Sequence, residues 1–288
     1  MIKDFYSLTK PGIIYGNLLT VIGGFFLASQ GNPNIELLII VLLGISFVIG
    51  CGCVLNNYID RDIDSLMKRT QKRELVTGVI SGKAALIFAV ILGVMGLFLL
   101  SYTNKLTVII AIVGLFVYVL LYSLIFKRRS IYGTLIGSIS GAVPVLVGYC
   151  AVTHHIDAGA IILFFILAIW QMPHSYAIGI SLFDDFSKAS IQILPVNKGI
   201  YITKIHILFY TILFFIAVCT LWKFGYVGLP YLVILGALAA LWIVFAILGF
   251  KTKNNRTWAR KMFLYSIIII VVFSITIALD WRVNPHFY

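Results

Sequence analysis

The stretch LLIIVLLGISFVIGCGCVLNNYIDRDID, at positions 37–64, decides the fold class of this chain. From Leu37 to Ile59 it carries no charged residue, and a helix of roughly 20 apolar residues is long enough to cross a bilayer core. Acids then stand at alternate positions from Asp60 to Asp64. A long apolar run that ends abruptly in charge predicts a membrane-spanning helix whose last turn reaches the edge of the hydrocarbon.

Apolar runs of similar length fill the rest of the chain. Only 11% of the 288 residues are charged and 61% are hydrophobic, whereas a soluble domain carries about 25% charged residues. Because no linker or polar appendage interrupts the runs, we expect one all-α polytopic membrane domain over residues 1–288, with about nine transmembrane helices. The predicted spans are 12–29, 36–56, 82–102, 106–126, 133–153, 158–182, 204–223, 228–250 and 262–280.

The net charge of +12 is distributed unevenly between the two sides of the predicted bundle. Of the 22 basic residues, 19 lie in the amino-terminal segment or after an even-numbered span, and only Lys105, Lys223 and Arg282 lie on the other side. By the positive-inside rule the amino terminus is cytoplasmic, and an odd number of spans puts the carboxyl terminus on the periplasmic or external side. We therefore expect a multi-pass protein of the cell (inner) membrane that contacts lipid and no nucleic acid.

The acids at the end of the second span form a regular pattern. Asn56, Asp60 and Asp64 are spaced i, i+4 and i+8 and share one helical face, whereas Asp62 lies on another. Their oxygen atoms suit a hard cation such as Mg²⁺. The three positions span about 12 Å along a helix, which favours two ions or a bridging ligand over one ion. The alternative is a solvated helix end whose acids pair with nearby bases.

Basic residues crowd the same side of the membrane as these acids. KRTQKR at 68–73 follows the acids directly, and KRR at 127–129 follows the fourth span. Acids that hold Mg²⁺ beside bases that neutralise charge suit a diphosphate ligand. The alternative is topological, because basic loops also anchor the cytoplasmic side of a membrane protein. The two interpretations are compatible.

The sixth span contains the block WQMPHSY at 170–176. Pro173 within an apolar span predicts a kink that frees backbone groups. His174 follows it, and such a histidine is either a buried, hydrogen-bonded residue or part of a cavity wall together with Trp170 and Tyr176. The sequence leaves both alternatives open.

Several blocks resemble a known family. NNYIDRDID resembles the N-x-x-x-D-x-x-x-D signature of the intramembrane aromatic prenyltransferase (UbiA) superfamily. Longer matches distributed along the chain resemble the one branch of that superfamily that makes haem o. They are TKPGIIYGNL at 9–18, GCVLNNYIDRDID at 52–64, KRRSIYGTLIGSISGA at 127–142, WQMPHSYAI at 170–178, ILPVNKG at 193–199 and WARK at 258–261.

The resemblance implies a helix bundle around a central cavity and a specific reaction. The branch transfers the farnesyl group of farnesyl diphosphate to a vinyl group of haem b, with water addition and with Mg²⁺, and its product serves respiratory terminal oxidases. The implied metal ligands are Asn56, Asp60, Asp64 and Asp185, and the three acids among them are the implied catalytic residues. The implied substrate-binding residues are Asn56, Lys68, Arg69, Arg73, Lys127, Arg128 and His174.

The sequence departs from the family pattern in its second acidic motif. Asp185 is followed four residues later by Ala189 rather than by an acid, and Asp184 stands where this branch commonly has a base. Glu74 follows Arg73 where the family often has proline. The acid motif also fits two other functions: prenyl transfer to another aromatic acceptor such as a quinone precursor, against which the block at 170–176 argues, and cation transport, which would need acids at mid-membrane.

Overall fold

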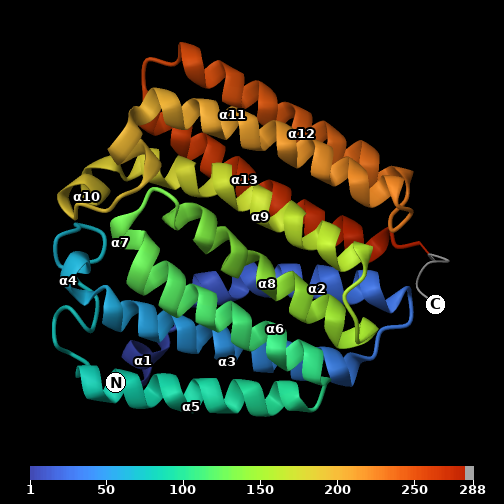
Figure 1. Cartoon of the computed structure of the whole chain (residues 1–288), viewed down its shortest axis with the longest axis horizontal. Coiled ribbons are helices and arrows are strands. Elements are labelled where there is room, and N and C mark those ends of the chain that lie inside the picture. Colours follow the sequence, from blue (N-terminus) through green and yellow to red (C-terminus); the bar gives the residue numbers. More distant parts are fainter. Residues whose placement is uncertain (283–288) are drawn as a thin grey trace.

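The computed structural model describes residues 1–282, and within them it contains nine helices long and apolar enough to span a membrane (Figure 1). This confirms the predicted count. The spans are α2 (Pro11–Ser29), α3 (Ile35–Ile59), α5 (Gly82–Ser101), α6 (Lys105–Phe116) with the π-helical η1 (Val117–Phe126) and α7 (Lys127–Arg129), α8 (Gly133–Thr153), α9 (Ala158–Ser181), α11 (Leu194–Lys223), α12 (Leu229–Leu248) with η2 (Gly249–Lys251), and α13 (Asn255–Leu279). Three short helices complete the set: α1 (Ile2–Leu8), α4 (Arg61–Asp64) and α10 (Phe183–Lys188).

Two spans begin earlier than the sequence predicts. Helix α11 begins at Leu194 rather than at 204, and α13 begins at Asn255 rather than at 262. Hydropathy detects only the apolar part of a helix, whereas backbone hydrogen bonds continue into polar sequence wherever the end is capped. The Asn254 side chain caps α13 by accepting from the amide of Thr257, and Gly199, at φ 85°, separates the first turn of α11 from the rest.

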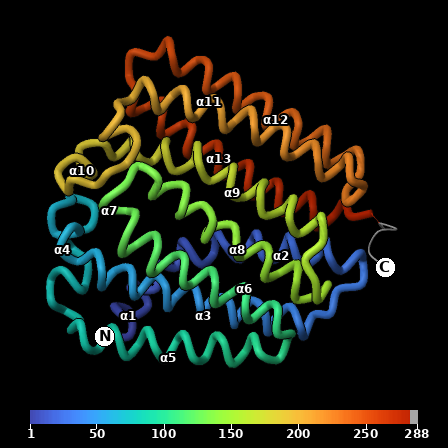
Figure 2. The backbone as a smooth tube through the Cα atoms, in the orientation of Figure 1, coloured from blue at the N-terminus to red at the C-terminus, as the bar shows by residue number. Residues whose placement is uncertain are grey.

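Several of the spanning helices pack against one another in closely contacting pairs. Helix α3 packs on α5, α9 on α11, and α2 on α8, as the tube in Figure 2 traces. The α2–α8 contact is close because a Cβ atom added at Gly24 would lie 2.5 Å from the Val145 carbonyl oxygen, and one added at Gly148 would overlap the Val21 backbone. Small residues of this kind let two helix backbones touch inside a bilayer.

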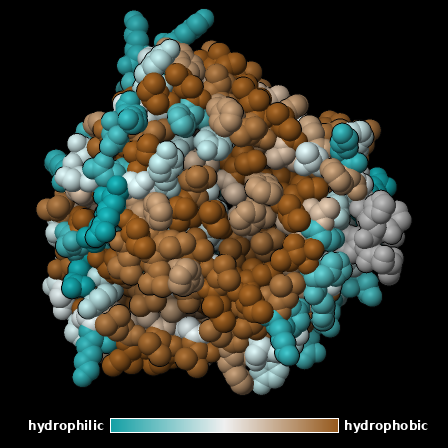
Figure 3. Space-filling view, viewed as in Figure 1, coloured by the Kyte–Doolittle hydropathy of each residue, from teal (hydrophilic) through white to brown (hydrophobic). Residues whose placement is uncertain are grey.

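The outer surface suits lipid. Figure 3 shows a broad hydrophobic face with hydrophilic residues gathered towards its two sides. Large apolar side chains such as Val94, Ile109 and Ile268 are exposed on the outer helices, and a continuous apolar surface of this size needs lipid as its solvent. The chain is therefore a multi-pass membrane protein.

The short helices α4, α7 and α10 all lie at one end of the bundle, on the left in Figure 1. Helices α4 and α10 each follow an even-numbered span and α7 ends one, so this end carries the basic segments that the sequence predicts to be cytoplasmic. The predicted external carboxyl terminus falls on residues 283–288, outside the described part of the chain.

Candidate functional site

A cavity of about 1340 Å³ lies between the helices, in agreement with the expected central cavity. Lys10, Arg69, Arg73 and Lys127 line part of it together with Asn56 and Asp64, and we call this part the charged end. Trp170, His174 and Phe263 line another part, which we call the aromatic wall. One continuous space therefore borders both a charged cluster and an aromatic surface.

The acid motif points inward, as its spacing predicts. Helix α3 ends at Ile59, but the amide of Asp60 still donates to the Asn56 carbonyl (2.9 Å) and the amide of Asp64 to that of Asp60 (2.8 Å). The helical spacing therefore continues across the junction into α4, and Asn56, Asp60 and Asp64 are at most 3% exposed. The side chain of Asp62, on the other face, is 62% exposed.

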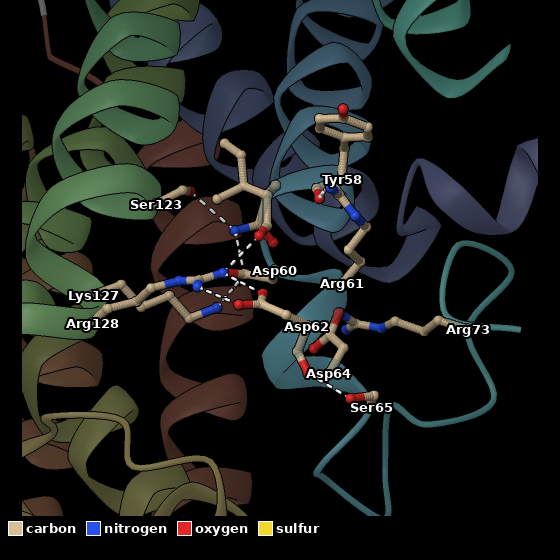
Figure 4. A network of polar contacts seen from close by, with 12 residues as sticks. Tyr58, Asp60, Arg61, Asp62, Asp64, Ser65, Arg73, Ser123, Lys127 and Arg128 are labelled. Carbon is tan, nitrogen blue, oxygen red and sulfur yellow. Dashed lines mark hydrogen bonds and ion pairs between the residues drawn. The ribbon is translucent and has the colours of Figure 1, made fainter. Parts of the chain in front are cut away.

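Basic side chains from two distant segments neutralise these acids (Figure 4). Lys127 pairs with Asp60, and Arg73 pairs with Asp64. Arg128 lies 3.7 Å from Asp60 and 2.6 Å from Asp62. The hydrogen bonds from Arg128 are the main cause that holds the pKa of Asp62 below its usual value. The two basic clusters that the sequence singled out thus meet the acids directly.

Asn56 connects this network to a base that the sequence analysis did not select. Its amide oxygen accepts from the Lys10 ammonium (2.6 Å), and its amide nitrogen donates to Asp60 (2.8 Å) and to Ser123 (3.0 Å). Lys10 has a positive φ of 53° before α2, and burial lowers the pKa of its ammonium to about 8. In the sequence, only the position of Lys10 within the block TKPGIIYGNL could have indicated that it belongs to the site.

The π-helical segment η1 explains how Lys127 reaches the site. Positions nine apart face opposite sides of an α-helix with 3.6 residues per turn, whereas the wider turn of a π-helix brings them close to one face. Tyr118 and Lys127 are nine apart, and both line the cavity. Tyr122 stacks on Tyr118 at 5.8 Å, and the Ser123 hydroxyl donates to the Tyr118 carbonyl (2.8 Å). The apolar sequence carried no sign of this geometry.

The aromatic wall is centred on His174. Helix α9 continues through Pro173 to Ser181, and the His174 ring lies between Trp170 (centroids 4.7 Å apart) and Phe263 (5.0 Å). Its Nδ1 atom is 2.7 Å from the Ser266 hydroxyl oxygen. Both interpretations of His174 therefore hold in part, because the residue is hydrogen-bonded and also lines the cavity.

A second hollow of about 590 Å³ lies beside the first and holds the remaining predicted residues. Lys68, Arg69 and Asp185 line it, and the Lys68 amide donates to Asp185 (3.2 Å). The fold thus joins Asp185 to the loop after α4, but within residues 1–282 no three His, Cys, Asp or Glu side chains are grouped closely enough to hold a metal ion. Arg256 and Arg260 of α13 also line the main cavity; the sequence analysis assigned neither of them to the site, although Arg260 stands in the block WARK.

The donor set nevertheless suits a hard divalent cation. Asn56, Asp60 and Asp64 offer only oxygen atoms to such an ion. The Oδ1 atom of Asp60 is buried and makes no hydrogen bond among the described residues; the Arg128 Nη2 atom lies 3.7 Å from it, which is an ion pair without a hydrogen bond. A buried carboxylate oxygen that accepts no hydrogen bond is costly, and a bound cation would reduce that cost.

The chain matches a known family over most of its length. Residues 17–268 match the UbiA prenyltransferase family. The chain is 52% identical to the protoheme IX farnesyltransferase of Photorhabdus laumondii over 287 residues, which cover 99% of this chain and 96% of that protein.

Solved structures share the fold at low identity. A structure of digeranylgeranylglyceryl phosphate synthase superposes with a TM-score of 0.79 at 22% identity and covers 96% of this chain and 98% of that one. A UbiA homologue from Archaeoglobus fulgidus, bound to DMAPP and Mg²⁺, superposes with a TM-score of 0.73 at 16% identity and covers 96% and 99%.

Proposed function

The chain belongs to the UbiA prenyltransferase family, and from this premise we propose that it transfers the farnesyl group of farnesyl diphosphate to a vinyl group of haem b. Addition of water then gives haem o. The observation that carries the proposal is the single cavity, which joins a charged end suited to a diphosphate to an aromatic wall suited to a flat acceptor. The 52% identity to a protoheme IX farnesyltransferase supports the choice of acceptor over a quinone precursor.

The charged end binds the diphosphate in this proposal. Lys10, Arg73 and Lys127 supply positive charge where the leaving group accumulates negative charge, and such preorganised charge lowers the barrier to bond breaking. Asn56, Asp60 and Asp64 hold these bases and provide the oxygen ligands for Mg²⁺, with Asp185 contributing from the second hollow. When bound, Mg²⁺ supplies Lewis acidity towards the diphosphate oxygens. Lys68, Arg69 and Arg128 extend the basic surface.

The carbon chemistry takes place between the charged end and the aromatic wall. Cleavage of the C1–O bond leaves an allylic farnesyl cation and a diphosphate. The terminal carbon of the haem vinyl group attacks this cation, and the positive charge moves to the carbon beside the porphyrin, where the ring delocalises it. Water adds to that carbon and loses a proton, which leaves a hydroxyl group. The Tyr118 and Tyr122 rings face the cavity and help to exclude water before the attack.

The reaction itself is the direct test. Membranes that contain the protein are incubated with haem b, farnesyl diphosphate and Mg²⁺, and the extracted haem is analysed by mass spectrometry. We expect a haem whose mass has increased by one farnesyl group and one hydroxyl group. Haem that stays unmodified while a different aromatic acceptor is prenylated would assign the protein to another branch of the family.

We also propose that the whole chain acts as one domain in the inner membrane, with the charged end in the cytoplasm and with its product passing to a terminal oxidase. We expect a thiol reagent added from the periplasmic side to label His155→Cys and not Lys72→Cys. Both positions are exposed, at opposite ends of the bundle. The reverse labelling pattern would contradict the topology and would place the diphosphate site on the wrong side.

We propose that His174 binds the acceptor. His174→Ala is expected to lower haem affinity by roughly 10-fold or more, while the affinity for an unreactive farnesyl diphosphate analogue stays within twofold of the wild-type value. The two halves of the site use different side chains, so they should separate in this way. Haem titration by absorbance, together with a melting curve on the same sample, checks the result. Lower thermal stability with unchanged haem binding would show that the role is structural.

A further inference from the structure

Ser266 on α13 makes two hydrogen bonds to the aromatic wall and is fully buried. Its backbone carbonyl accepts from the indole nitrogen of Trp170 at 3.0 Å. Its hydroxyl oxygen lies 2.7 Å from the Nδ1 atom of His174. One small residue therefore contacts both of the α9 rings of the aromatic wall, Trp170 and His174, although it lies 92 positions from His174 along the chain.

The Ser266 hydroxyl limits the tautomers open to His174. It lies within hydrogen-bonding distance of both the Phe263 carbonyl oxygen (2.6 Å) and the Nδ1 atom of His174 (2.7 Å), and a hydroxyl has only one proton to donate. When the hydroxyl donates to the carbonyl, which can only accept, its oxygen accepts from His174 and Nδ1 carries the hydrogen. In a neutral imidazole the other nitrogen, Nε2, keeps a free lone pair. Within residues 1–282, Nε2 has no hydrogen-bond partner, and the ring borders the cavity.

We propose that Ser266 is a positioning residue that holds His174 as the Nδ1-protonated tautomer, so that Nε2 binds the iron of the acceptor haem. This inference rests on the proposed function and extends it. Histidines that bind a metal commonly donate their other ring N–H to a fixed acceptor, which sets the tautomer and the ring orientation. The Trp170 and Phe263 rings on either side of His174 restrict its rotation further.

The fixed ring gives the reaction a means of choosing between the two vinyl groups. A porphyrin held by its iron at one point, with its plane set by the ring that binds it, can turn only about that bond. The cavity walls then limit this rotation. Without the bond from His174 to the iron, either of the two vinyl groups of haem b could approach the charged end. Loss of Ser266 therefore affects acceptor orientation more than it affects diphosphate binding.

The test compares three substitutions of Ser266 with a matched control. Ser266→Ala removes the acceptor, Ser266→Cys keeps a similar volume but accepts weakly, and Ser266→Thr restores a hydroxyl. The control is Ser274→Ala on the same helix, because Ser274 is also buried and donates only to the Ile270 carbonyl (2.9 Å). Each full-length protein is titrated with haem b and, separately, with metal-free protoporphyrin IX, and absorbance spectra are recorded.

We expect Ser266→Ala and Ser266→Cys to lower haem affinity by roughly 10-fold or more and to lose the spectrum of imidazole-bound haem. Binding of metal-free protoporphyrin should stay within twofold, and Ser266→Thr and Ser274→Ala should match the wild-type protein. An unchanged haem spectrum in Ser266→Ala would overturn the proposal, whatever its melting temperature. Equal losses for haem and metal-free protoporphyrin would also overturn it, because the defect would then lie in pocket shape.

The same measurements distinguish this inference from the proposed function. A wild-type protein that makes haem o without showing an imidazole-bound haem spectrum overturns the role of Ser266 and leaves farnesyl transfer in place. A wild-type protein that shows the spectrum, loses it in Ser266→Ala and makes no haem o supports the role of Ser266 and overturns farnesyl transfer.

Discussion

Asp60→Asn and Asp64→Asn are each expected to lower kcat/KM for haem o formation by roughly 100- to 1,000-fold. Both carboxylates are almost fully buried, and each holds a basic side chain at the charged end: Lys127 in the case of Asp60 and Arg73 in the case of Asp64. Asparagine keeps the shape but removes the negative charge, so the bases lose their counter-charge and a cation loses its ligand. Steady-state turnover measured by haem extraction checks the prediction.

The matched control is Asp62→Asn. Asp62 lies between the other two acids in sequence, but its side chain is 62% exposed and pairs only with Arg128 at the surface. Exposed ion pairs contribute little, so we expect less than roughly a 10-fold change. A melting curve for each variant shows whether the protein still folds, because removing one partner of a buried pair costs about 3–5 kcal/mol. Equal losses at all three positions would rule out the acid motif as the metal–diphosphate site.

Lys127→Met is expected to weaken binding of an unreactive farnesyl diphosphate analogue by roughly 100-fold, since it removes a charge-assisted contact at the leaving group. Haem affinity should be unchanged, because the aromatic wall lies on other helices. Arg129→Met is the control: Arg129 ends the same span but is exposed, and it does not line the cavity. We expect it to bind the analogue like the wild-type protein. Isothermal titration of the analogue in the presence of Mg²⁺ measures both variants.

The double variant Asp60→Asn/Lys127→Met separates two roles of the lysine. If Lys127 served only to neutralise Asp60, the double variant would bind the analogue as well as Asp60→Asn alone does. We expect the double variant to bind more weakly than Asp60→Asn, because the diphosphate itself needs the positive charge. Equal binding by these two variants would contradict the diphosphate role and would leave Lys127 as a structural partner of Asp60.

Much of the fold and part of the site could be predicted from local sequence. The nine spans could be predicted because the transfer of an apolar segment from water into lipid depends only on the composition of that segment. The shared face of Asn56, Asp60 and Asp64 was predicted because helical spacing relates residues only four positions apart. The starts of α11 and α13 were misplaced, since hydropathy does not detect a capped helix end in polar sequence.

Contacts between distant segments were beyond the sequence. The pairing of Lys127 with Asp60 joins positions 67 apart and depends on the π-helical turn of η1, which turns the lysine towards the cavity. Lys10 reaches Asn56 through a backbone conformation that is unusual for lysine. Nothing in the sequence indicated a role for Ser266, because its hydroxyl lies beside His174 only through the packing of α13 against α9.

The sequence by itself therefore determined that this protein lies in lipid, how many spans it has, how its charge is distributed and that its acid motif shares one helical face. These follow from the transfer of each segment between water and lipid, which is a property of local composition. Tertiary structure alone decided which base meets which acid, where Asp185 lies relative to the first motif, and which side chains surround His174. Those features depend on how helices far apart in the sequence pack, and a hydrogen bond forms only when packing brings its two atoms within about 3 Å.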